Sequence, residues 1–151
     1  MSDLREYPTA ELAAQPIGYW STAVSRAVLG RIRAELSTEG LTQPHWWTLN
    51  HVAGDPGGWE RGPLARKLLP FADPGTEFGP VFDDLVARGW LTETPQFTLT
   101  GAGEAGRLRA RALLAAAHEQ IHRGVPAGEY AAAVNVLRRM AGNLGGVSDL
   151  P

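Results

Sequence analysis

Two short segments of alternating apolar and polar residues, 90–92 and 96–99, lie in a chain whose other patterned segments have helical periodicity. Residues 93–95 separate them, and the pair predicts a short β-hairpin. A lone two-stranded hairpin is only marginally stable in water, so it has to pack against helices. The sequence therefore predicts a mainly α fold with a small β-hairpin that leans on a helical core.

Apolar residues recur at three- and four-residue steps in the other segments, which is typical of amphipathic helices. A long helix is expected from about Ile17 to Gly40, and Thr42 is expected to cap a second helix that carries Pro44 in its first turn. Further helices are expected at 62–71, 76–88 and 100–123, with a last one after a break at 124–126. The expected inward-facing residues of the three short helices are Trp46, Leu49, Ala53, Leu64, Leu68, Leu69, Phe78, Phe82 and Leu85.

Three short helices followed by a hairpin are the plan of a winged helix-turn-helix. A chain of 151 residues has the usual length of one domain. We therefore expect residues 1–151 to form a single domain. In it, 42–100 form the winged-helix lobe, and the helices of 1–41 and 101–151 flank it as a dimerisation region.

The last helix predicts a homodimer. An apolar seam runs along it with heptad-like spacing, and no later element of the sequence is available to cover that seam. Two copies related by a two-fold axis would bury both seams against each other. The seam consists of Tyr130, Val134, Leu137, Ala141 and Leu144.

Composition excludes several classes of protein. The chain has no cysteine, which rules out disulfides, thiol nucleophiles, iron–sulfur clusters and cysteine-ligated zinc. No apolar run approaches the roughly 20 residues that cross a bilayer, and the first residues are charged where a secretory signal needs an apolar stretch. We therefore expect a cytoplasmic protein that needs no cofactor and does not bind a membrane.

Five stretches, in the right order, resemble the MarR family of winged-helix transcriptional regulators. They cover the first helix, the opening of the second, the end of the recognition helix, the exit from the wing and the final helix. These stretches are 16–20 with 25–27, 40–46 with Leu49, 85–91, 99–103, and 129–130 with Val134 and 137–140.

The resemblance implies a ligand-responsive transcriptional regulator that binds double-stranded DNA as a homodimer, with a small-molecule pocket between its dimer and DNA lobes. Two recognition helices would enter successive major grooves. The residues expected to contact phosphates are Arg61, Arg66, Lys67 and Arg88, and those expected near base edges are Thr76 and Glu77.

The charge of the lobe leaves a second function open. Residues 42–100 hold four basic and seven acidic side chains, whereas lysine and arginine supply most non-specific DNA affinity. The segment 76–84 also lacks the family's basic residues, and the wing is shorter than usual and has no arginine at its tip. The alternative is therefore a scaffold that has lost DNA binding and serves as a small-molecule binding protein or an enzyme.

Aromatic and histidine residues gather near the start of the second helix and face the first helix. The functional interpretation is a flat cavity for a small aromatic ligand, and the other interpretation is packing at the lobe junction. In the enzyme alternative, His45 and His51 would be the acid and base, although we expect a binding protein rather than an enzyme. The expected ligand-binding residues are Tyr19, Trp20, His45, Trp47 and His51.

Residues 118–122 read His-Glu-Gln-Ile-His, the helical pattern that holds catalytic zinc in metalloproteases. Such a site also needs a third protein ligand and a substrate cleft, and this segment lies in an arm that is expected to meet a dimer partner. We therefore expect no metal here, and interpret His118 and His122 as a solvated or interfacial pair.

Overall fold

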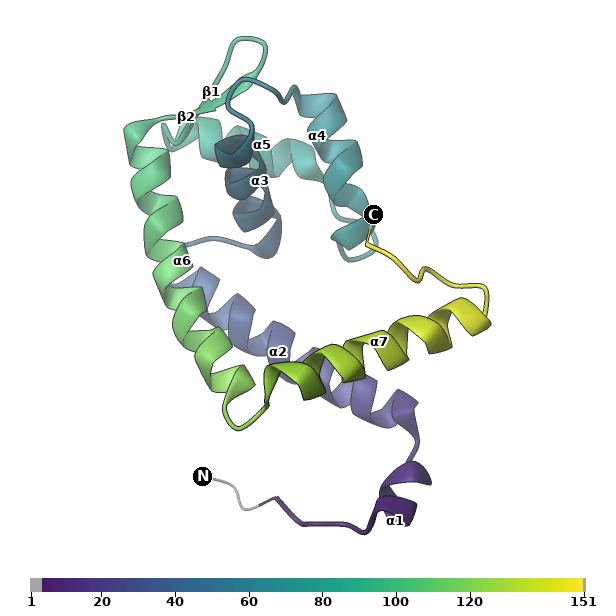
Figure 1. The fold of residues 1–151 in the computed structure, drawn as a ribbon. Helices are drawn as coiled ribbons and strands as arrows, with labels where there is room; N and C mark the ends of the chain where they lie inside the picture. Colours follow the sequence, from purple (N-terminus) through teal and green to yellow (C-terminus); the bar gives the residue numbers. More distant parts are fainter. Residues whose placement is uncertain (1–3, 151) are drawn as a thin grey trace.

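The computed structural model describes residues 4–150 and shows a mainly helical chain with one antiparallel hairpin, so the predicted fold class is confirmed (Figure 1). The helices are α1 (Thr9–Ala13), α2 (Ile17–Ser37), α3 (Gln43–Gly54), α4 (Arg61–Leu68), the 3₁₀ helix η1 (Leu69–Phe71), α5 (Phe78–Ala87), α6 (Gly101–His122) and α7 (Ala127–Asn143); the strands are β1 (Leu91–Glu93) and β2 (Phe97–Leu99).

The lobe consists of α3, α4, α5 and the hairpin, which lie together in the upper part of Figure 1. The hairpin pairs Leu91 with Leu99 across its register. It leans on the helices, as expected, because the buried ring of Phe97 lies 5.0 Å from the ring of Phe82 on α5. The Phe97 N–H also donates to the carbonyl of Trp59, at 2.8 Å, so the segment before α4 lies beside β2 and is hydrogen-bonded to the wing.

The buried core lies in the lobe and in the adjoining parts of the two long helices. From the end of α2 it extends to the middle of α6, and α2 packs along α6. Its members are Leu36, Leu41, Leu49, Val52, Leu64, Leu68, Phe78, Phe82, Leu85, Leu91, Phe97, Ala110 and Leu114.

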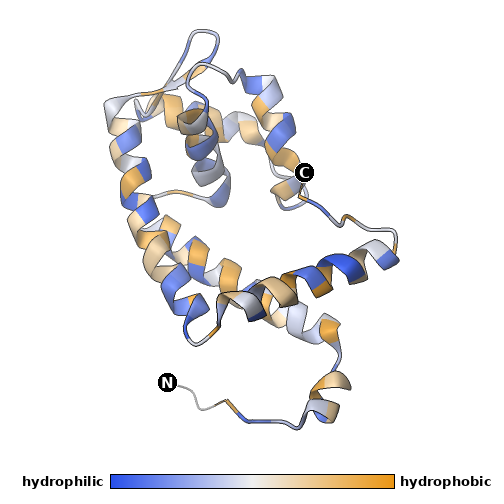
Figure 2. Ribbon diagram, in the orientation of Figure 1, coloured by the Kyte–Doolittle hydropathy of each residue, from blue (hydrophilic) through white to orange (hydrophobic). Residues whose placement is uncertain are grey.

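The outer helices are different. After the positive-φ turn at Gly124, α7 runs across the lower part of Figure 1 and has no buried residue along its described length. The N-terminal part of α2 is equally exposed. Figure 2 shows that hydrophobic residues nevertheless recur along both helices. These helices therefore present apolar faces that the chain itself does not cover.

Two helix boundaries and one additional helix differ from the sequence prediction. Because Pro70 cannot donate a backbone hydrogen bond, α4 ends at Leu68 and tightens into η1. As a result Leu69, expected inward, is exposed. The next helix begins at Phe78 rather than at residue 76, since the turn through Gly75 leaves Glu77 as the N-cap. The short helix α1 was not expected at all.

The inward face of α3 is rotated relative to the prediction. Trp46 and Ala53 are half-buried, and Leu49 alone of the predicted stripe is fully buried. His45 is buried in their place because both of its ring nitrogens have hydrogen-bond partners. At the other end of the chain, Leu144 caps α7 instead of extending its seam.

No helix in residues 4–150 combines the length and the apolar character that a membrane span requires.

Candidate ligand groove and DNA-binding surface

A groove of about 320 Å³ lies where α2, α3 and the connection to α5 meet. It therefore touches both the long helix α2 and the segment that leads into α5, the second helix of the helix-turn-helix pair. The residues that line it are Arg33, Ser37, Leu41, Thr42, Gln43, Pro44, Trp47, Ala72, Asp73 and Thr76.

One wall of the groove is aromatic and another is polar. Trp47 forms the aromatic wall, and its ring lies 6.2 Å from that of Phe71. On the polar side, Arg33 donates to Gln43 Oε1 at 2.9 Å and to Asp73 Oδ2 at 2.8 Å. A half-exposed guanidinium beside a flat apolar wall suits a small aromatic ligand that carries an acidic group.

His45 lies directly behind the groove and is 8% exposed. Its Nδ1 accepts from the backbone N–H of Thr42 at 3.2 Å, which closes a capping box at the start of α3. Its Nε2 lies 2.9 Å from Oδ2 of Asp84 on α5. Because a carboxylate only accepts, Nε2 carries the proton in this arrangement. His45 thus joins α3 to α5.

Burial lowers the pKa of His45 below its ordinary value, although the hydrogen bond that His45 donates to Asp84 and the charge of Asp84 oppose that shift. The imidazole is therefore held in its neutral form near neutral pH. A neutral ring that is wedged between two helices is a structural link, and its position away from the groove does not suit a catalytic acid or base.

The helix-turn-helix pair consists of α4 and α5, and Arg61 fixes its geometry. The Arg61 guanidinium donates to both Glu93 oxygens, at 3.0 and 3.1 Å, and pairs with Asp83 on α5 at 2.9 Å. These carboxylates raise the pKa of Arg61. The same guanidinium lies 5.5 Å from the Phe82 ring centroid. Arg61 thus ties α4, α5 and the wing together, and its charge is balanced within the lobe.

The similarity to known proteins lies in the fold. No protein-family model matches the chain, and no curated protein matches its sequence. Among solved structures, the DNA complex of the Mycobacterium tuberculosis MarR family protein Rv2887 is 27% identical, with a TM-score of 0.64 over 87% of this chain and 99% of that one. The salicylic acid complex of the same protein is 28% identical, with a TM-score of 0.58 over 83% and 98% of the two chains.

The structure of a second protein also resembles this fold. The PcaV transcriptional regulator of Streptomyces coelicolor is 21% identical, with a TM-score of 0.70 over 88% of this chain and 100% of that one. This chain has the MarR fold. The resemblance found in the sequence is thereby confirmed.

In the MarR fold of this chain, the five predicted ligand residues do not form one site. Trp47 lines the groove, and His45 lies behind it. The Nδ1–H of His51 donates to the Trp47 carbonyl, at 2.8 Å, and the His51 ring lies beside Trp59. Tyr19 is 65% exposed near the start of α2, about 20 Å along the helix from Arg33. Trp20 lies next to it, in edge-to-face contact.

Sequence reasoning missed several residues of the groove. Neither Arg33 on α2 nor Asp73 at the turn before α5 is among the residues predicted for the site. Nothing in their spacing signals that they meet, because they lie 40 positions apart. The capping position of Thr42 and the tryptophans of α3 were the available signals, and they located one wall.

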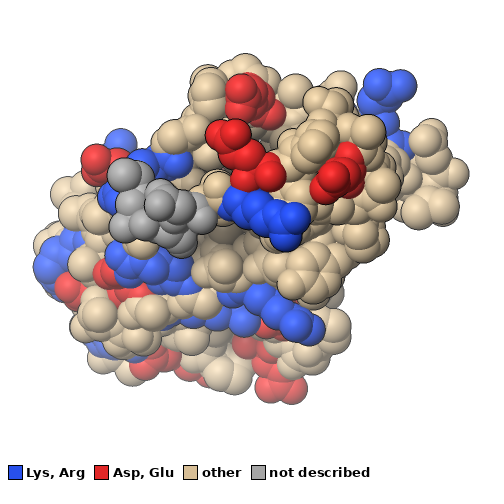
Figure 3. Space-filling model, turned by 90° about the horizontal axis from the view of Figure 1, so that it is seen from below, with Lys and Arg blue, Asp and Glu red and all other residues tan. Residues whose placement is uncertain are grey.

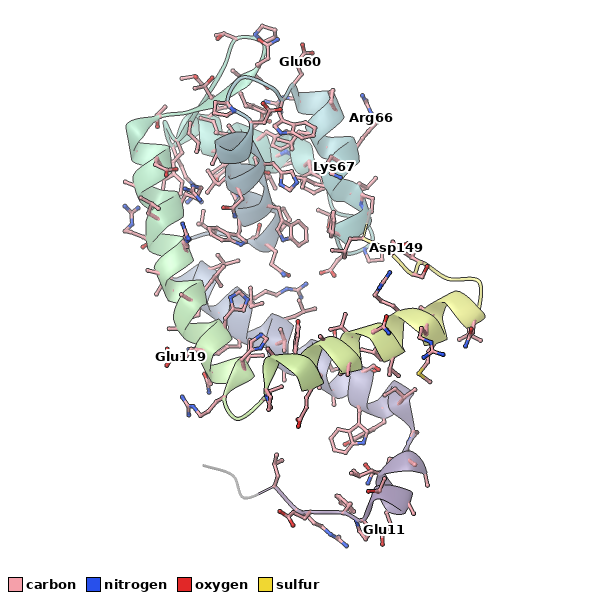
Figure 4. The ribbon with its side chains drawn as sticks, viewed as in Figure 1. Glu11, Glu60, Arg66, Lys67, Glu119 and Asp149 are labelled. Atoms are coloured by element: carbon pink, nitrogen blue, oxygen red, sulfur yellow. The ribbon has the colours of Figure 1, made fainter. Side chains whose placement is uncertain are left out.

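The predicted DNA-contacting residues also differ in availability. Arg88 pairs with Asp84 at 2.7 Å and donates to the Gly40 carbonyl at 2.7 Å, so it serves, like Arg61, inside the fold. Arg66 and Lys67 are exposed on α4, and Figure 4 shows Arg66 projecting outward from that helix. Glu77 is the exposed N-cap of α5.

Thr76 donates its hydroxyl to the Asp73 carbonyl at 2.7 Å and lines the groove. The exposed face of α5 carries Pro80, Asp83, Val86 and Ala87, so it presents one carboxylate and no basic side chain. Figure 3 shows basic and acidic side chains interspersed on the underside of the molecule.

His118 and His122 are exposed on α6, and the ring of His122 lies 4.6 Å from that of Tyr130. Within the described part of the chain, no three histidine, aspartate or glutamate side chains gather as a metal site would require. The helical spacing of the two histidines is present, but nothing near them supplies the third ligand.

Proposed function

We propose that this protein is a ligand-responsive, DNA-binding transcriptional regulator of the MarR type that acts as a homodimer. The observation that carries the proposal is the position of the groove, which lies between the long helix α2 and the segment entering α5. A ligand at that junction touches both parts of the molecule and can change their relative position.

The ligand class follows from the groove's chemistry. The flat wall of Trp47 suits an aromatic ring, and Arg33 suits an acidic substituent. The similar Mycobacterium tuberculosis protein has been solved with salicylic acid, which has both features. The ligand would compete with Asp73 for the guanidinium of Arg33 and so act on the segment that leads to α5.

The DNA side of the proposal is supported by the fold of the protein solved with DNA. Helix α5 would enter the major groove, and Arg66 and Lys67 on α4 would lie near the phosphate backbone. Because Arg61 and Arg88 are engaged inside the fold, we expect few phosphate contacts and a shallow dependence of DNA affinity on salt.

The homodimer is supported by the outer helices. Tyr130, Val134 and Leu137 are large apolar side chains that lie partly exposed on α7. Soluble monomers rarely expose a continuous apolar face of this kind. A second copy would cover it and would place two copies of α5 on one face of the dimer.

The test is a mobility-shift titration with the DNA upstream of the protein's own coding sequence, at low salt, with and without salicylate. We expect binding at micromolar protein or below, and a changed affinity when salicylate is present. Arg33→Gln should keep DNA binding and lose the response, whereas Arg26→Gln, an exposed position on the same helix, should keep both. No shift at micromolar protein contradicts the proposal.

The acidic exposed face of α5 favours one second candidate, a MarR-fold protein that binds a small molecule and no longer binds DNA. The same titration separates the two. Quenching of tryptophan fluorescence by salicylate, with no shift of any upstream DNA, would favour this second function.

A further inference from the structure

An unbroken series of side-chain contacts joins the groove to α5. Thr42 lines the groove, and its hydroxyl oxygen lies 2.7 Å from Nδ1 of His45. The opposite ring nitrogen of His45 lies 2.9 Å from Oδ2 of Asp84, in the middle of α5. Three side chains therefore span the distance from the groove wall to this helix.

The series closes on itself. Oδ2 of Asp84 also accepts from Nε of Arg88, at 2.7 Å. Arg88 in turn donates to the carbonyls of Glu39, at 3.3 Å, and Gly40, at 2.7 Å. Those carbonyls lie just before Thr42 in the chain. The end of α2, the start of α3 and the middle of α5 are thus held by one ring of polar contacts.

The part of this ring that a ligand can reach is at the groove, where Thr42 meets His45. The neutral His45 ring has a single lone pair, on Nδ1, and two groups of Thr42 face it: the hydroxyl at 2.7 Å and the backbone N–H at 3.2 Å. If an acceptor on a ligand in the groove accepted the hydrogen bond of the Thr42 hydroxyl, only the longer contact, from the Thr42 backbone N–H, would remain on Nδ1. Because His45 is buried, that change would be poorly screened.

We propose that Thr42, His45 and Asp84 form a positioning chain through which an acidic ligand in the groove changes how α5 is held. The inference rests on the proposed function and deepens it, because it names the route by which the ligand acts. When the Thr42 hydroxyl turns to the ligand, Nδ1 of His45 keeps only the longer contact from the Thr42 backbone N–H, and His45 holds Asp84 less firmly.

A double-mutant cycle in the full-length protein tests the proposed positioning chain without ligand or DNA. Thr42→Val removes the hydroxyl at nearly constant shape, Asp84→Asn removes the charge at the other end, and the readout is hydrogen exchange of the α5 amides. We expect Thr42→Val to speed exchange about fivefold in the wild-type background and less than about twofold beside Asp84→Asn. Equal effects in the two backgrounds would overturn the proposal.

The matched control is Ser37→Ala. Ser37 also lines the groove, but its hydroxyl donates to the Ala34 carbonyl within α2 and does not reach His45. Its effect on α5 exchange should be the same with and without Asp84→Asn. Coupling of Ser37 to Asp84 as strong as that of Thr42 would count against a specific chain.

Two substitutions of His45 provide the second arm, with salicylate as the probe. Asn can accept from Thr42 but cannot reach Asp84, whereas Gln can donate to Asp84 but cannot accept from Thr42. We expect each variant to bind salicylate and DNA separately, and salicylate to stop changing DNA affinity in both. An undiminished salicylate effect in His45→Asn would overturn the chain.

The two arms separate the two proposals. If salicylate leaves the DNA affinity of the wild-type chain unchanged, the ligand response in the proposed function fails. The positioning chain is then decided by the exchange cycle alone.

Discussion

The lobe and the outer helices are built from similar residues and differ in what covers them. In the lobe, Phe82 and Phe97 have no exposed surface, and the apolar faces of α3, α4 and α5 meet in one core. On α7, Leu137 also lies on an apolar helix face, but its side chain is 42% exposed. One region is complete within the chain, and the other has an apolar face without an intramolecular partner.

This difference explains where each function can lie. A lobe with a closed core keeps its shape when the molecule binds something, so it can present α5 as a rigid unit. In the proposed homodimer, the outer helices would take their partner from a second copy, so the distance between the two lobes would depend on how these helices pack. The groove lies where α2 meets the lobe, so a small ligand bound there would contact both and could change their relative position.

The largest expected effect is in the lobe. Phe82→Ala removes a ring that contacts Phe78 and Phe97 at centroid distances of 5.9 and 5.0 Å, and we expect it to lower the free energy of unfolding by about 3–5 kcal/mol. Val86→Ala, on the exposed face of the same helix, should change it by less than about 1 kcal/mol. Urea denaturation measures both, and similar values would contradict a closed lobe core.

An intermediate effect is expected on α7. Leu137→Glu removes about 1.5–3 kcal/mol of apolar burial at each side of a dimer interface and places a charge there. We expect a monomer or an aggregate, with the lobe's near-UV circular dichroism retained in any soluble monomer.

Arg138→Glu is the control for that substitution. Arg138 is exposed on a different face and pairs with Asp149, so the dimer should persist. Sedimentation at about 10 µM, above any obligate-dimer dissociation constant, measures both variants. A wild-type monomer at that concentration would contradict the interface.

The smallest effect is a pH dependence through His45. Because its pKa is lowered in the fold, the unfolded chain takes up a proton as pH falls below about 6.5 while the folded chain resists it. The free energy of unfolding should therefore fall between pH 6.5 and the lower folded pKa. His45→Asn should flatten this slope, and His118→Asn, exposed on α6, should leave it unchanged. Denaturation at pH 5 to 7.5 measures it.

The candidate site was predictable only in part. Trp47 was among the predicted ligand residues because aromatic clusters have a local signature, whereas Thr42 was predicted only as a helix cap. Arg33 and Asp73 were missed because their contact joins α2 to a distant turn. His45 was found but assigned to the cavity, since helical spacing does not reveal which neighbour a ring nitrogen faces.

Local periodicity was sufficient for every helix but α1, for the hairpin and for the apolar face of α7, because each of these depends on residues a few positions apart. The charges of the lobe could be counted but not interpreted. Arg61 meets Asp83 and Glu93 only after α4, α5 and the wing have packed, and this packing turns a predicted phosphate contact into an internal link. Tertiary structure decided these roles because side-chain electrostatics depend on distance in space, which sequence separation does not fix.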